Sequence, residues 1–179
     1  MKILKLIVCL SLISAICAGV LAAINVATKD SIKEIRRKQT LAAAAAVMPA
    51  SVDKSKVEPV EGQKGIFIGR DASGNIAGYA VEGSDPSGYG GVIVLMVGFT
   101  PDCKISTYQK LVAMETPGLG TNLSSPLFMK QFEGMDASTP LMVKKDGGKI
   151  EAITSATITS RAVCGAINDA KKKMEGIKK

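Results

Sequence analysis

The sequence predicts an α+β protein in which a single N-terminal transmembrane helix precedes a small domain with an antiparallel sheet and flanking helices. A long uncharged run opens the chain, and short apolar runs separated by turn residues follow between residues 65 and 112. Apolar residues then recur at helical spacing after residue 160. We therefore expect a membrane anchor over 1–27, a helical stalk and linker over 28–62, and a globular domain over 63–179.

The anchor is predicted from the run Leu6 to Ile24, nineteen residues without a charge that follow Lys2 and Lys5. This length is what an α-helix needs to cross the hydrocarbon core of a bilayer. A cleaved signal peptide is the alternative, because a basic start and the small residues around Ala18 would also fit one. The run is longer than a usual signal-peptide core, which favours an uncleaved single-pass anchor in contact with membrane lipid.

The charges that flank the anchor leave its orientation open. Lys29, Lys33, Arg36, Arg37 and Lys38 outnumber the two lysines before the anchor, and this count alone would place the body of the protein in the cytoplasm. Long domains, however, are translocated largely regardless of charge.

Between the anchor and the domain, residues 28–48 are rich in helix-favouring residues and end at Pro49, so we expect the membrane helix to continue as a stalk. Residues 51–62 have no periodicity and are predicted to be a linker.

The sheet is predicted from four apolar segments. Residues 65–70 and 76–81 flank the turn at 71–75 as a hairpin, and two further strands are expected over 92–99 and 104–112. Residues 83–91 are too rich in glycine to predict regular structure and are expected to form a loop around Tyr89. A short helix is expected over 126–132, with Phe128, Met129 and Phe132 in the core.

The composition excludes several classes of function. The chain has no histidine, which excludes metal sites with histidine ligands, histidine general bases, and Ser–His or Cys–His catalytic pairs. Cys103 and Cys164 are far apart and no Cys-x-x-Cys spacing occurs, so we expect small buried side chains and no metal site. A disulfide between these two cysteines remains open for a domain outside the cytoplasm.

The net charge of +7 does not predict nucleic-acid binding. Aromatic residues make up only 4% of the chain, and no basic stretch is interleaved with rings that could stack on bases. Five of the 23 basic residues lie in the last nine positions, where a solvated helix end accounts for them.

Residues 154–160 contain five hydroxyl side chains and follow the apolar run 150–153, so we expect a strand-to-helix junction here. The first turn of a helix carries unpaired N–H groups and the positive end of the dipole, which together favour an anionic group such as a phosphate. Helix capping alone is the competing interpretation, because Ser and Thr are preferred N-cap residues.

A second candidate segment is Glu115-Thr116-Pro117-Gly118-Leu119-Gly120, in which a rigid proline and two glycines suit a turn that runs backbone groups along a ligand. It lacks the third glycine and the strand-then-helix context of a dinucleotide-binding fingerprint. Tyr89, among three glycines, could offer a ring face or a hydroxyl to the same ligand.

The order of residue types in 150–160 resembles the covalent attachment signature of FMN-binding domains. In that signature an acidic residue is followed, three positions later, by a Ser/Thr-Gly-Ala-Thr core. Glu151 occupies the position of the usual Asp, Thr154 opens the core, and Ser155 replaces the usual Gly. Ala156 matches, and Thr157 corresponds to the threonine that carries the flavin through a phosphoester.

Gly88 to Gly91, the run 92–98 and the segment 115–120 also occur in the expected order, so most of the chain resembles the G subunits of Rnf complexes, the ion-translocating ferredoxin–NAD oxidoreductases. This resemblance implies covalent FMN in an FMN-binding domain over 63–179, and an electron-transfer role between ferredoxin and NAD that is coupled to Na⁺ or H⁺ transport. It also implies a flavin domain outside the cytoplasmic membrane, membrane and peripheral subunits as partners, and a flavin-transferring enzyme for maturation. The complete active site would be shared with those subunits, and the chain itself would hold neither a metal nor nucleic acid.

The residues expected at the flavin site are Thr157 as acceptor, with Thr154, Ser155, Ala156, Glu115, Thr116, Gly118, Leu119, Gly120 and Tyr89 around it. Two alternatives remain. The C subunit of Na⁺-translocating NADH:quinone reductases has the same attachment signature but is generally longer. A membrane-tethered structural protein would share the helix and the small domain but would be colourless.

Overall fold

The computed structural model describes residues 2–136 and 139–177 and divides the chain into two compact units, Met1–Gln39 and Thr40–Lys179. Helix α1, Lys2–Val47, accounts for the first unit and enters the second. It ends just before Pro49, where the sequence predicts the end of the stalk, because proline cannot continue a helix.

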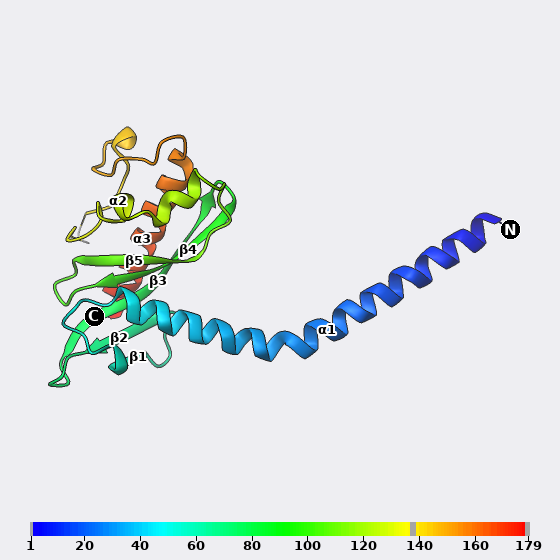
Figure 1. Ribbon diagram of the computed structural model, residues 1–179, viewed down its shortest axis with the longest axis horizontal. Helices are drawn as coiled ribbons and strands as arrows, with labels where there is room; N and C mark the ends of the chain where they lie inside the picture. Colours follow the sequence, from blue (N-terminus) through cyan, green and yellow to red (C-terminus); the bar gives the residue numbers. More distant parts are fainter. Residues whose placement is uncertain (1, 137–138, 178–179) are drawn as a thin grey trace. The chain divides into compact units, whose positions relative to one another are not determined.

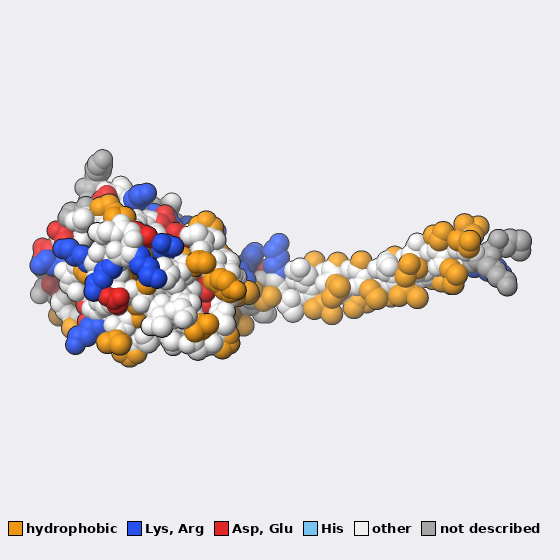
Figure 2. Space-filling view, turned by 90° about the horizontal axis from the view of Figure 1, so that it is seen from above, with side chains coloured by type: hydrophobic (Ala, Val, Ile, Leu, Met, Phe, Trp, Pro, Cys, Tyr) orange, Lys and Arg blue, Asp and Glu red, His pale blue; other side chains and the backbone are white. Residues whose placement is uncertain are grey.

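The first unit has the length and composition of a membrane-crossing helix. Its most apolar stretch has no buried side chain, and large hydrophobic residues from Ile3 to Ile24 are exposed along it. Figure 2 shows these hydrophobic side chains along the helix and a cluster of charged side chains toward its C-terminal part.

The second unit is built on a five-stranded antiparallel sheet in the order β1-β2-β3-β4-β5 (Figure 1). Each strand pairs with the next in sequence, as in Phe67 with Ala80 and Val97 with Tyr108. The strands are β1 Val57–Pro59, β2 Ile66–Arg70, β3 Ile76–Gly88, β4 Gly91–Phe99 and β5 Ile105–Val112. The predicted antiparallel sheet and its first hairpin are thus confirmed.

Two predictions about loops are wrong. The expected loop over 83–91 is mostly strand, since β3 continues to Gly88 and pairs Ser84 with Val94. Glycine at position 83 serves packing, because a Cβ there would lie 2.0 Å from the carbonyl oxygen of Ala166 in α3. The expected linker over 51–62 contains the 3₁₀ turn η1, Lys54–Lys56, and strand β1.

Helix α3, Thr157–Ile177, covers one face of β3 and β4. Side chains alternate across a strand, and β4 shows this directly, because Ile93, Leu95, Val97 and Phe99 join the core under α3 while Met96 belongs to the opposite face. The end of α1 supplies Ala43, Ala44 and Val47 to that opposite face, and Met48 follows directly after the helix.

The segment between β5 and α3 contains only short helices among its described residues: η2 Gly120–Ser124, α2 Pro126–Met129 and η3 Lys144–Asp146. Phe128 and Phe132 are buried, as predicted, in edge-to-face contact with each other, and Tyr108 contacts Phe132 in the same way. Helix α2 is shorter than the predicted 126–132. The strand expected over 150–153 does not form, because Ile150 makes only an isolated bridge with Val143.

Cys164 is a residue of α3 and lies in the core as a free thiol, so it does not form the disulfide with Cys103 that the sequence left open. Burial raises the pKa of the Cys164 thiol to about 12, which makes it a small buried side chain without reactivity at neutral pH.

Candidate functional site

The hydroxyl cluster lies where an irregular loop enters α3, whose first residue is Thr157. The first helical hydrogen bond joins the Ser160 N–H to the Ala156 carbonyl at 3.0 Å. The N–H groups of residues 157–159 therefore have no acceptor within the helix, and they point out of its positive end. This end of α3 provides the donors that an anionic group needs.

The five hydroxyls of this cluster differ in their surroundings. Ser160 is fully buried, donates to the Ala156 carbonyl and accepts from the Ile153 N–H at 2.9 Å. Thr159 is 1% exposed and donates to Glu115 at 2.6 Å. Thr154 and Ser155 are exposed, and Thr157 is half-buried.

Ser155 adopts a left-handed backbone conformation with φ of 60°. Glycine occupies this region without a steric cost, whereas a residue with a Cβ is strained there. The conformation turns the chain from residue 153 into α3, and the turn is closed by a 2.9 Å hydrogen bond from the Ala156 N–H to the Ile153 carbonyl.

The segment after β5 folds into a tight turn against the start of α3. Gly118 has φ of 75° and donates its N–H to the Thr121 hydroxyl at 3.0 Å, while its carbonyl accepts from the Asn122 amide at 2.9 Å. Gly120 is buried, and a Cβ there would lie 2.5 Å from a carboxylate oxygen of Glu115. The glycines thus allow the turn and bring it close to the carboxylate.

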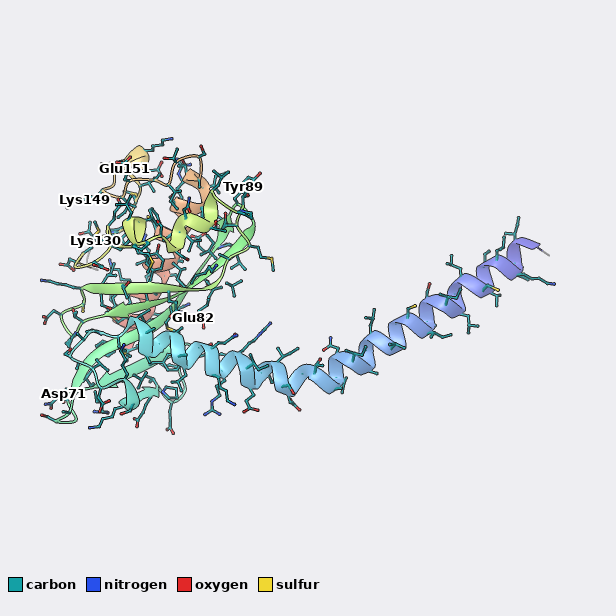
Figure 3. The ribbon with its side chains drawn as sticks, viewed as in Figure 1. Asp71, Glu82, Tyr89, Lys130, Lys149 and Glu151 are labelled. Carbon is teal, nitrogen blue, oxygen red and sulfur yellow. The ribbon has the colours of Figure 1, made fainter. Side chains whose placement is uncertain are left out.

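These two segments and the end of the β3–β4 ribbon enclose a cavity of about 440 Å³. Figure 3 places Tyr89 and Glu151 at one end of the compact unit and Asp71 at the opposite end. The cavity is lined by Tyr89, Glu115, Thr116, Leu119, Gly120, Ser155, Ala156, Thr157, Ile158 and Thr159. The structure therefore brings together eight of the ten residues predicted from the sequence.

The other two, Thr154 and Gly118, line an adjoining cavity of about 810 Å³. Leu119 and Ser155 line both cavities and lie between them. The second cavity also contains Leu127, Phe128, Gln131 and Ile153, which were not predicted as site residues. The sequence analysis also did not predict Ile158 and Thr159, which line the first cavity. Their position in the first turn of the predicted helix could have indicated them.

Glu151 does not line the first cavity but lines the second, and hydrogen bonds of its backbone hold it in place. Its N–H donates to the Gln131 side chain at 2.7 Å, and its carbonyl accepts from the same amide at 3.2 Å. Its carboxylate forms an exposed ion pair with Lys144. The predicted motif residue Glu151 thus fixes the loop that leads to Thr154 and leaves its side chain at the surface.

Residues 88–172 match the family of FMN-binding domains. The G subunit of an ion-translocating oxidoreductase complex from Methanosarcina acetivorans is 34% identical, with 94% of this chain and 93% of that relative aligned. The G subunit of the Na⁺-translocating ferredoxin:NAD⁺ oxidoreductase complex from Acetobacterium woodii is 31% identical over 93% of this chain and 88% of that relative.

The chain belongs to the family of G subunits of Rnf complexes. It therefore contains an FMN-binding domain, and the two relatives are subunits of ion-translocating oxidoreductase complexes. The crystal structure of the C subunit of a Na⁺-translocating NADH–quinone reductase from Parabacteroides distasonis shares the fold, with a TM-score of 0.52 over 64% of this chain and 62% of that chain at 22% identity. The relatives that align over most of their length are G subunits, whereas the C subunit shares only the fold.

The cavity fits the FMN of this family. The free N–H groups at the start of α3 suit a phosphate, and Leu119, Ile158 and Tyr89 offer the apolar and aromatic surface that a flat ring system needs. Among the described residues, no group of three or more Cys, Asp or Glu side chains is arranged to hold a metal ion.

Proposed function

We propose that this chain is the flavin-carrying electron-transfer subunit of an Rnf complex, with FMN attached covalently to Thr157. It relays electrons in the path between ferredoxin and NAD, and the complex couples this path to Na⁺ or H⁺ transport. Bound FMN supplies both one-electron and two-electron chemistry. The residues of the chain hold the ring, exclude water and set the surrounding charge.

The observation that carries this proposal is the difference among the clustered hydroxyls. Thr157 is half-buried, lines the 440 Å³ cavity and is the first residue of α3. Thr159 and Ser160 are buried, and their hydroxyls already donate to Glu115 and Ala156. A phosphate on Thr157 is next to the N–H groups of the first turn, which stabilise its charge.

Attachment replaces the hydroxyl proton of Thr157 with the flavin phosphorus. The flavin-transferring enzyme must therefore supply an activated flavin phosphate, an anhydride whose other half leaves. Thr154, Ser155 and Glu151 are exposed around the acceptor and give that enzyme a surface to contact. Thr154 and Ser155 also have hydroxyls near the phosphate position, so we expect them to support attachment without being essential.

Helix α1 anchors this carrier in the cell membrane, with the flavin domain outside the cytoplasm. A carrier that is both tethered and covalently loaded is suited to relaying electrons between fixed partners, which are the other membrane and peripheral subunits of the complex. The ferredoxin and NAD sites then belong to those subunits.

Mass spectrometry of the full-length chain, co-produced with an active flavin-transferring enzyme, tests the attachment. We expect one covalent FMN on the wild-type protein and none on Thr157→Val, which keeps the side-chain shape but lacks the hydroxyl. Thr154→Val, the same change three residues earlier, should retain FMN with at most a reduced yield. A flavin-free wild-type protein would support the membrane-tethered structural alternative, and FMN on Thr157→Val would assign the acceptor to another hydroxyl.

A further inference from the structure

Among the described residues, Glu115 is the only acidic one that lines the 440 Å³ cavity, and it is 7% exposed. One carboxylate oxygen accepts the Thr159 hydroxyl at 2.6 Å, and the other accepts the Gly90 N–H at 3.2 Å. Both oxygens act as acceptors, which is the arrangement that an ionised carboxylate satisfies. A negative charge is therefore fixed in the wall of the cavity.

This charge has no cationic partner nearby in the part of the chain that the structure describes. No Lys or Arg there lies within 4.0 Å of the Glu115 carboxylate, and no basic side chain lines the cavity. Its neutral donors are the Thr159 hydroxyl and the Gly90 N–H, and the positive end of α3 is close to Thr159. These neutral donors offset the charge less than a paired Lys or Arg would, so the field of this carboxylate reaches into the cavity.

The surrounding backbone is adapted to the carboxylate. A Cβ on Gly120 would lie 2.5 Å from one oxygen, and a Cβ on Gly88 would lie 2.9 Å from the other. Two glycines from separate segments thus leave space for the charged group, and its two hydrogen bonds hold it in one position. Such a fixed position is what an electrostatic role requires, since a mobile carboxylate would turn toward solvent.

We propose that the ionised side chain of Glu115 lowers the reduction potential of the flavin held in this cavity. This inference rests on the proposed function. A fixed negative charge disfavours the addition of electrons to a nearby ring, and charge close to the flavin is a means by which proteins set its potential. Burial strengthens the effect, because the interior screens charge less than water does.

The test compares Glu115→Gln with the wild type as full-length proteins, both loaded with FMN by the transferring enzyme and confirmed by mass spectrometry. Glutamine keeps the length of the side chain and one oxygen acceptor but removes the charge. Spectroelectrochemical titration should show a higher midpoint potential in Glu115→Gln, by at least a tenfold change in the one-electron equilibrium, or about 59 mV. Glu58→Gln, the same change at an exposed position on β1, should leave the potential unchanged.

Glu115→Asp separates charge from shape, because it keeps the charge on a shorter side chain and should retain a potential closer to that of the wild type. An unchanged potential in flavin-loaded Glu115→Gln would overturn the inference while leaving the proposed function intact. A Glu115→Gln protein that cannot be loaded would also overturn it, because the carboxylate would then be needed for attachment. A wild-type protein without covalent FMN would instead remove the proposed function itself.

Discussion

The Thr159 hydroxyl donates a 2.6 Å hydrogen bond to the Glu115 carboxylate across 44 residues of sequence. This bond joins the turn after β5 to the first turn of α3, the two segments that form most of the cavity wall. Both side chains are buried, so the bond is largely shielded from competition by water. The cavity therefore depends on a contact between two motifs that are distant in the sequence.

Removing the hydroxyl should destabilise the domain. We expect Thr159→Val to lower the free energy of unfolding by about 2 kcal/mol, because hydrogen bonds to charged groups contribute about 1.5–3 kcal/mol and a buried carboxylate loses a donor. Thr159→Ser keeps the hydroxyl donor but removes one methyl group, so it should lower the free energy of unfolding by only about 1 kcal/mol. Chemical denaturation of the detergent-solubilised chain, followed by circular dichroism, measures both, and equal losses would contradict the role of this bond.

Ser155 offers a prediction about the backbone. Its φ of 60° is unfavourable for residues with a Cβ and most unfavourable for β-branched ones. Ser155→Val should therefore lower the free energy of unfolding by about 1–2 kcal/mol. Ser155→Gly should leave it unchanged or raise it slightly, since relief of strain offsets the greater flexibility of the unfolded chain.

Thermal unfolding of these two variants measures the difference. Thr154→Val is the matched control for the first, because it introduces the same side chain at the preceding exposed position. If Ser155→Val and Thr154→Val proved equally stable, the left-handed conformation at Ser155 would carry no cost. The left-handed conformation at Ser155 also explains why glycine is the usual residue at this position of the FMN-attachment signature.

The fold was predictable where local patterns decide it. The uncharged run of α1, the hairpin around 71–75 and the helical spacing of Val163, Ile167 and Met174 all indicate elements that the structure contains. The extension of β3 over 83–88 could not be predicted from its glycines, because Gly83 is explained by the close approach of α3 and Gly88 by the close approach of Gly91 and Glu115, and these contacts are tertiary. β1 is three residues long and shows no alternation that could reveal it.

The motifs in the sequence indicated which segments form the site, but they did not indicate the contacts within it. The order of hydroxyls in 154–160 and the turn at 115–120 indicate the segments that meet at the cavity. That Thr159 points inward to Glu115 depends on how α3 is rotated against the sheet, which the motif does not determine. The second cavity depends on where Leu127 and Gln131 lie in three dimensions, and no pattern in 126–132 shows this.

The orientation of the domain can be tested in cells. We expect the body to lie outside the cytoplasmic membrane although basic residues between Lys29 and Lys38 favour the opposite, because long domains are translocated largely regardless of charge. External protease should degrade the domain in intact spheroplasts while a cytoplasmic marker survives. Protection in spheroplasts, with degradation only after lysis, would place the domain in the cytoplasm.

Gly83 tests the packing of α3 on the sheet. A Cβ at this position would lie 2.0 Å from the Ala166 carbonyl oxygen, so Gly83→Ala must push α3 away from β3. We expect a loss of at least about 2 kcal/mol in the free energy of unfolding, within the range that overpacking produces. Gly176→Ala, near the end of α3, has open space around its Cβ and should be neutral or slightly stabilising. Similar unfolding midpoints for the two variants would contradict the close contact.

The ion pair between Arg161 and Asp146 predicts how stability depends on pH. Arg161, one turn into α3, donates to both carboxylate oxygens of Asp146 in η3, at 2.8 and 2.7 Å. The hydrogen bonds from Arg161 lower the pKa of Asp146 in the folded protein below its ordinary value of 3.8. The folded state therefore binds this proton less readily than the unfolded state, and stability rises with pH across the interval between the two pKa values.

The contribution of the pair is fully present above the ordinary pKa of Asp and is lost as the pH falls through the lower pKa of the folded state. Asp146→Asn should thus be slightly less stable than the wild type at pH 7, and the difference should shrink as the pH falls from about 4 through the lower pKa of the folded state. The difference should be small, because both side chains are partly exposed to solvent. Arg161→Gln should give a similar loss at pH 7, and combining the two changes should cost less than the sum of the single losses, because they remove one shared interaction. Urea denaturation at several pH values measures this, and a difference that grows on acidification would mean that the charge of Asp146 does not stabilise the fold.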